Sequence, residues 1–151
     1  MGLLVDLDLA PLIAAHGLRY LVETDTGDGA GAEHALTYDL DQVFSIEPSH
    51  KQALTVALKH SAEQRLTIIN AKIDKGLKEA LEEIPAEVPA AFWLSDGGKL
   101  PLLAGLRDLS ADVVLIESGI RADPLIIDGI LAASHKVEPA DGFLRATPRQ
   151  G

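Results

Sequence analysis

Residues 88–134 read VPAAFWLSDGGKLPLLAGLRDLSADVVLIESGIRADPLIIDGILAAS. Two runs in this segment, 90–94 and 112–116, are apolar at nearly every position, and each is followed by a turn and then by leucines or isoleucines at helical spacing. Asp123 and Pro124 mark the start of the second helix, as an N-cap residue and a proline at the first helical position. Such apolar runs are typical of strands buried on both faces. Two strand–helix units in tandem therefore predict parallel strands joined by right-handed crossovers.

The first third of the chain has a different pattern. Residues 18–24 and 34–40 each have the apolar content of a strand, and the segment between them, 25–33, is rich in glycine and aspartate. This arrangement predicts an antiparallel β-hairpin with a long loop at its tip. A further short strand is expected at 43–46.

The middle of the chain can be interpreted in two ways. Ser49 and Gln52 are placed as a capping box that opens a helix. If its apolar stripe continues to Ile84, a single helix of roughly 35 residues fills the region. If residues 65–70 form a strand, as their β-branched side chains favour, the region is helix, strand, helix. We favour the second interpretation because helices of that length are uncommon and Gly76 would weaken one.

Together these patterns predict one domain over residues 1–151, of the α/β (or α+β) class. Its three parts are a β-hairpin-rich part at 1–47, a helical middle at 48–87 and a βαβα unit at 88–147. The sheet is expected to be mixed but largely parallel, in a three-layer-like arrangement with helices on its faces. A chain of 151 residues is long enough to bury a core without disulfides.

Composition excludes several classes of function. The formal net charge is −10, from 23 acidic and 13 basic residues, whereas nucleic acids and anionic membranes are recognised by clustered lysine and arginine. No run approaches the roughly 18 apolar residues that a membrane span needs, and the first residues lack the basic start of a signal peptide. The absence of cysteine excludes thiol nucleophiles and thiolate metal sites. We therefore expect a soluble cytoplasmic protein with no nucleic-acid or membrane partner.

Candidate functional residues lie in the loops that follow the predicted strands. Ligands of open α/β sheets bind beyond the carboxyl ends of the strands, where loops enter helices. Three loops qualify, at 70–72, 95–99 and 117–121. Their acids and hydroxyls suit proton transfer or attack on a substrate, and their glycines and cations suit an anionic ligand at a helix N-terminus. We assign catalytic roles to Asp96, Glu117 and Ser118, and ligand binding to Gly97, Gly98, Lys99, Gly119 and Arg121.

None of these loops matches a diagnostic motif, and each is also consistent with a simple turn. The segment 97–99 lacks the upstream glycine and the following Ser or Thr of a P-loop, and Ser118 lacks the flanking glycines of a nucleophile elbow. Loop 25–33 has glycine where an EF-hand needs side-chain oxygens, and the five histidines include no pair at helical spacing. No metal site is predicted, and no cofactor is assigned.

Two functions remain open. The first is a small α/β protein that binds an anionic small molecule, either a nucleotide or a phosphometabolite, with hydrolase or transferase activity as an option. The alternative is a non-enzymatic interaction or assembly module that forms a homo-oligomer or docks on a protein partner. Turn chemistry at adjacent strand ends favours the first, and the missing catalytic motifs favour the second. We rank the first slightly ahead.

Overall fold

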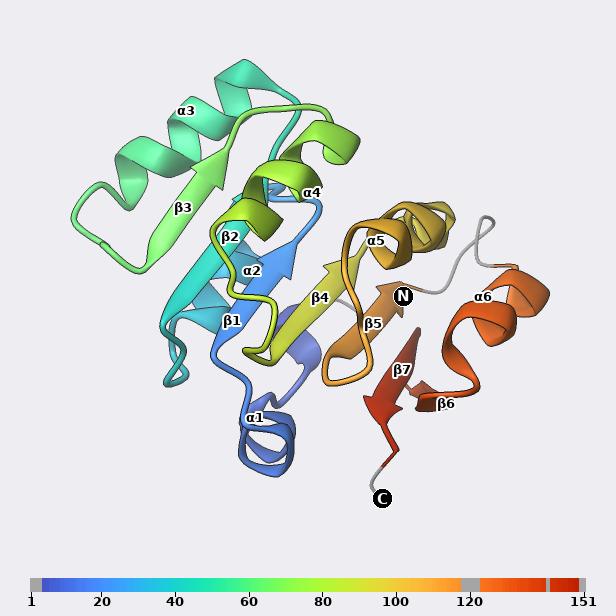
Figure 1. Cartoon of the computed structure of the whole chain (residues 1–151). Coiled ribbons are helices and arrows are strands. Elements are labelled where there is room, and N and C mark those ends of the chain that lie inside the picture. The colour runs from blue at the N-terminus through green and yellow to red at the C-terminus, as the bar shows by residue number, and fades with distance from the viewer. Residues whose placement is uncertain (1–3, 118–122, 141, 150–151) are drawn as a thin grey trace.

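A computed structural model describes residues 4–117, 123–140 and 142–149. It contains the strands β1 (Tyr20–Glu23), β2 (Gln42–Ile46), β3 (Leu66–Ile69), β4 (Ala90–Leu94), β5 (Val113–Glu117), β6 (His135–Ala140) and β7 (Phe143–Pro148). They form one seven-stranded sheet in the order β3-β2-β1-β4-β5-β7-β6 (Figure 1). Strands β1 to β5 are parallel to one another, and β7 is antiparallel to both of its neighbours.

Helices cover both faces of the sheet, so the described part of the chain has three layers. The helical segments are η1 (Leu4–Asp6), α1 (Ala10–His16), α2 (Ala30–Ala35), α3 (His50–Lys59), α4 (Ile73–Glu82), η2 (Gly97–Lys99), α5 (Leu100–Leu106) and α6 (Pro124–Leu131). Residues of α4, α5 and α6 share one core with Phe92, and residues of η1, α1 and α2 share the other with Trp93. Helix α3 packs against β3. Among the described residues, no helix combines the length and the apolar character that crossing a bilayer requires.

The structure confirms the parallel units predicted for residues 88–134. Strand β4 is buried along its whole length and β5 along all but its last residue, as expected for strands with a helix layer on each face. Asp123 caps α6 by accepting a hydrogen bond from the backbone N–H of Leu125 (2.9 Å). In the middle of the chain the helix–strand–helix interpretation is confirmed, because β3 lies between α3 and α4.

The predicted N-terminal hairpin is wrong. Residues 34–40 contain the end of α2 and a loop, with no return strand, and β1 pairs with β2 in parallel. The reason is local. Gly27 and Gly29 adopt positive φ values of 53° and 90°, which turn the chain directly from β1 into α2. The antiparallel pairs of the described sheet lie at its other end, between β5 and β7 and between β7 and β6.

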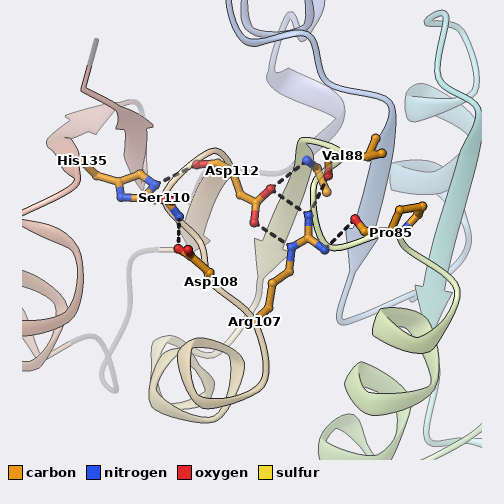
Figure 2. Close-up of polar contacts among 8 residues, drawn as sticks. Pro85, Val88, Arg107, Asp108, Ser110, Asp112 and His135 are labelled. Carbon is orange, nitrogen blue, oxygen red and sulfur yellow. Dashed lines mark hydrogen bonds and ion pairs between the residues drawn. The ribbon is translucent and has the colours of Figure 1, made fainter. Parts of the chain in front are cut away.

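A buried ion pair joins the amino ends of β4 and β5 (Figure 2). Arg107 Nε donates to Asp112 Oδ2 (2.8 Å), and the two side chains are only 6% and 1% exposed. Asp112 Oδ1 also accepts from the backbone N–H of Ala90 (2.9 Å). The guanidinium donates in addition to the carbonyls of Val88 (2.7 Å) and Pro85 (3.3 Å), so one charge pair fixes the loop that leads into β4.

Replacing Asp112 with alanine should destabilise the protein strongly, because the buried guanidinium of Arg107 loses its counter-charge. Removing one partner of a buried pair typically costs about 3–5 kcal/mol. Urea unfolding of D112A and wild type measures the difference. Lys75→Ala is the control, because its ion pair with Glu79 is exposed, spans 3.9 Å and should contribute at most about 0.5 kcal/mol. An equal decrease in the free energy of unfolding of the two variants would contradict this role of Asp112.

Candidate functional site

The order of the strands places a crevice between β1 and β4. From β1 the chain builds outward to β2 and β3 on one side, and then crosses to β4 and β5 on the other. Ligands of open α/β sheets bind at such a switch point, beyond the carboxyl ends of the strands. A cavity of about 230 Å³ lies there. Its lining comes from η1, from the loop after β1, and from the carboxyl ends of β1, β4 and β5.

The loop after β1 forms one wall of this cavity. It reads Gly27-Asp28-Gly29-Ala30-Gly31-Ala32, which fits the G-x-G-x-x-G/A pattern of a dinucleotide-binding turn between a strand and a helix. Gly29 donates its backbone N–H to the carbonyl of Thr26 (2.9 Å), and Ala32 is fully buried. The loop is also held to its neighbours. Thr26 donates its N–H to the carbonyl of Ile46 (3.3 Å), and the side-chain amide of Gln52 donates to the carbonyl of Gly27.

Glu23, the last residue of β1, lies under this loop and lines the cavity. Its Oε1 accepts from the hydroxyl of Ser45 (2.7 Å), whose oxygen lies 2.6 Å from that of Thr26. Burial raises the pKa of Glu23 to about 8. The Ser45 hydrogen bond opposes this shift, and the negative charges of Asp25 and Asp28 add to it. The site therefore contains a buried carboxyl group that keeps its proton at neutral pH.

Glu47 directly follows β2, 20 residues after Gly27. Its side chain is buried, and Oε2 accepts from the backbone N–H of Ser49 (2.9 Å). The side-chain amide of Asn70, the residue after β3, donates to the carbonyl of Glu47 (2.9 Å). In dinucleotide-binding folds an acid about 20 residues beyond the glycine turn accepts hydrogen bonds from ribose hydroxyls. Position and spacing thus fit Glu47 to that role.

The opposite wall comes from the ends of β4 and β5. Ser95 donates its backbone N–H to the hydroxyl oxygen of Thr24 (3.0 Å), and that hydroxyl donates to the carbonyl of Trp93 (3.1 Å). Glu117, the last residue of β5, also lines the cavity. Burial raises the pKa of Glu117, and the nearby charge of Asp25 raises it further. The two walls together therefore carry several carboxyl groups around one small cavity.

The structure places only some of the residues assigned from the sequence in the lining of this cavity. Glu117 lines the cavity, whereas Asp96 heads η2 and accepts from the N–H of Gly98 (2.8 Å). Gly97 is buried in η2. Lys99 Nζ lies 2.7 Å from Asp74 Oδ1 of α4, so its charge is engaged away from the cavity lining. The remaining assigned residues, Ser118, Gly119 and Arg121, lie outside the described part of the chain.

Sequence analysis missed the first wall of the site. The signal was present, because the G-x-G-x-x-A pattern begins at Gly27 and an acid follows at Glu47. That pattern predicts a binding turn only when a helix follows it. The alternating apolar residues at 34–40 predict a strand instead of a helix, and that prediction makes residues 25–33 the tip of a hairpin.

Comparison with known proteins shows the fold. No protein-family model matches the sequence, and a search of curated proteins finds no match to it. Among solved structures, an O-methyltransferase from Bacillus cereus in complex with SAH is 17% identical, with a TM-score of 0.67 over 93% of this chain and 79% of that one. An rRNA methylase from Streptococcus thermophilus is 10% identical, with a TM-score of 0.59 over 93% and 97%. The 23S rRNA methyltransferase ErmE is 15% identical, with a TM-score of 0.55 over 93% and 67%. The chain thus has the Rossmann-like α/β fold of methyltransferases, with a mostly parallel seven-stranded sheet.

Gly31→Ala should destabilise the protein, because a Cβ at this position would overlap Glu23 Oε2, and the buried Glu23 side chain can move aside only by disturbing its hydrogen bond to Ser45. Overpacking of a tight interior typically costs about 1–3 kcal/mol. The matched control is Gly129→Ala in α6, where a Cβ meets no atom within 4 Å and the helix should gain up to about 1 kcal/mol. Thermal unfolding of both variants measures the contrast. A gain of stability in both variants would contradict the close approach of Glu23 to Gly31.

Glu23→Gln should change how stability depends on pH. The unfolded carboxyl ionises near 4.5, whereas the folded one keeps its proton up to about 8. Between these values the folded state binds more protons than the unfolded state, so the free energy of unfolding falls as pH rises. Glutamine cannot ionise, so the variant should lack this part of the fall. Urea unfolding at both ends of the interval measures it, and the same fall in both proteins would assign the titration to another group.

Proposed function

We propose that this protein is a methyltransferase that uses S-adenosylmethionine (SAM) and acts on a small-molecule acceptor. The observation that carries the proposal is the cavity at the carboxyl ends of β1 and β4, with the glycine turn on one wall and Glu47 beyond the next strand. The likeness to a methyltransferase in complex with SAH supports it, because that fold accommodates the demethylated form of the cofactor.

The charge of the cavity favours SAM over a dinucleotide. Its lining includes four acids, Glu23, Asp25, Asp28 and Glu117, and no lysine or arginine. Glu23 keeps its proton at neutral pH, but the charges of Asp25 and Asp28 would repel a pyrophosphate, whereas the sulfonium and ammonium groups of SAM are cations that these carboxylates attract. The same feature argues against the anionic ligand expected from sequence. That expectation relied on cations such as Lys99, which is paired with Asp74.

The loop after β1 and the residue after β2 would hold different parts of the cofactor. Gly27 and Gly29 let the backbone approach the ligand closely, because no Cβ stands in the way. Glu47 would accept hydrogen bonds from the ribose hydroxyls, and Asp25 would attract the ammonium group. When bound, SAM supplies a methyl group that its positive sulfur makes reactive toward a nucleophile.

Glu117 is the candidate base for the acceptor. It lies on the β5 side of the cavity, and burial and the charge of Asp25 raise its pKa above its ordinary value, which makes it a stronger base. It would take the proton that an acceptor hydroxyl or amine loses as the methyl group is transferred. Asp96, at the head of η2, is the second candidate from the same edge of the sheet.

A small acceptor fits this chain better than RNA does. Some structures with the same fold are rRNA methylases, so the fold itself permits a nucleic-acid substrate. However, the net charge of −10 opposes binding to a phosphate backbone, which depends on clustered lysine and arginine. Methylation of duplex or single-stranded RNA by the purified protein would overturn this choice of acceptor.

Isothermal titration calorimetry with SAH tests the cofactor. Wild type should bind SAH and show no binding of NAD. Glu47→Gln should weaken SAH binding about tenfold or more, because the acceptor of the ribose hydroxyls loses its charge. Glu87→Gln is the control, since Glu87 is exposed in the loop before β4. This variant should bind SAH with the affinity of wild type. No binding of SAH to wild type, or tighter binding of NAD, would refute the proposal.

A further inference from the structure

The strand β3 forms one edge of the sheet, and no described strand pairs with its outer side. The carbonyls of Arg65 and Ile69 accept from the backbone N–H groups of Val43 and Glu47 in and after β2. Because successive residues of a strand bond on alternate sides, the N–H and C=O of Ile68 point away from β2. Such an edge can pair with another extended segment.

Hollows flank this edge on both faces of the sheet. On the α4 side, an open cavity of about 690 Å³ includes Thr67 and Ile69 together with Phe44 and the acids of α4. On the α3 side, two smaller cavities of about 180 and 220 Å³ share Ile68. The side chains of β3 thus alternate between the two hollows, as those of any strand added beside it would.

The two hollows differ in chemistry. The α4 side is acidic, with Asp41, Glu79, Glu82 and Glu83 in its lining. Asp41 is paired with Arg19 (2.6 Å) and Glu79 lies 3.9 Å from Lys75 Nζ, so the attraction for a further cation rests mainly on Glu82 and Glu83. On the α3 side, the cavity that includes Leu54 is mainly apolar, and α3 leaves Leu54 51% exposed there. The other cavity on this side also includes His60, Ser61 and Glu63. A strand lying along β3 would therefore place every second side chain among carboxylates and the others against aliphatic groups.

We propose that the outer edge of β3 binds an extended segment of a partner protein in which basic and apolar residues alternate. The backbone of this segment adds a strand to the sheet, its lysines or arginines enter the acidic hollow beside α4, and its apolar side chains cover Ile68 and Leu54. Main-chain hydrogen bonds provide affinity in this mode, and the alternate pockets provide selectivity. The edge lies outside the lining of the proposed methyl-transfer cavity, so the inference does not depend on that function.

A second copy of this chain fits the edge less well than a basic partner. If two β3 strands paired, each would present Thr67 and Ile69 to the acidic hollow of the other, and neither side chain is a cation. Arg65, the nearest cation, already donates to the carbonyls of Leu36 (2.7 Å) and Tyr38 (3.0 Å). Charge complementarity therefore selects a partner of different sequence.

The probe is a fluorescent hexapeptide of alternating lysine and valine with blocked termini. Its control has the same composition with three lysines followed by three valines. Anisotropy should show binding of the alternating peptide and much weaker binding of the control. The peptide should also slow hydrogen exchange at the N–H of Ile68, measured by NMR, because this group would become hydrogen-bonded.

Charge reversal tests the acidic hollow. The double variant Glu82→Lys, Glu83→Lys should weaken the alternating peptide about fivefold or more, since both substitutions turn attraction into repulsion. Glu87→Lys with Asp128→Lys changes the net charge equally at exposed positions outside the hollow, and should have little effect.

Three results would overturn the inference. They are equal affinity for the two peptides, binding without slowed exchange at Ile68, and equal weakening by the two double variants. A dimeric mass of the wild-type protein together with no peptide binding would assign the edge to a second copy instead. SAH titration of the same samples measures the proposed cofactor site independently, so failure of peptide binding can be distinguished from failure of SAH binding.

Discussion

The buried carboxylate of Asp112 determines where the two central strands of the second half begin. It accepts from Arg107 and from the N–H of Ala90, while its own backbone carbonyl lies 2.8 Å from Nε2 of His135 at the start of β6. Burying a charge pair carries a desolvation penalty that its attraction barely offsets. We interpret the pair as a fixed point that sets the relative register of β4, β5 and β6, rather than as a source of net stability.

The edges of the sheet at the amino and carboxyl ends of the parallel strands therefore differ in structure. At the amino ends, the guanidinium of Arg107 donates to the carbonyls of Pro85 and Val88 and holds the loop before β4 in place. At the carboxyl ends, glycines and short side chains leave a cavity, and a protonated Glu23 lies beneath it. A rigid base allows loops at the opposite edge to carry acids that repel one another. Burial is the main cause of the raised pKa values of Glu23 and Glu117, and the charge of Asp25 adds to both shifts.

Local patterns explain what the sequence could predict. The strands β3, β4 and β5 are continuous apolar or β-branched runs, and the turns after them carry their own signals, so the parallel units were found. By contrast, α2 has only six residues, too few to show helical periodicity, and Leu36, Tyr38 and Leu40 alternate like a strand although they lie in a loop.

The same limit applies to the residues around the candidate cavity. Glu117 ends an obvious strand, so the sequence predicts its place at the edge of the sheet where the cavity lies. The place of Glu47 relative to the glycine turn is visible only when residues 30–35 are known to form a helix. The pairing of Lys99 with Asp74 joins residues 25 positions apart, and no local pattern shows such a contact. Such a contact can be predicted only when the packing of α4 beside η2 is known.

The position of β7 has a consequence for how the sheet is completed during synthesis. β7 comes last in the described order of the chain, yet it lies between β5 and β6, and β6 pairs with β7 alone. Until β7 inserts, β5 has an open edge and β6 has no partner at all. A nascent chain on the ribosome thus exposes the apolar strand β5 until nearly all the described residues have emerged, a period in which chaperone binding and aggregation compete.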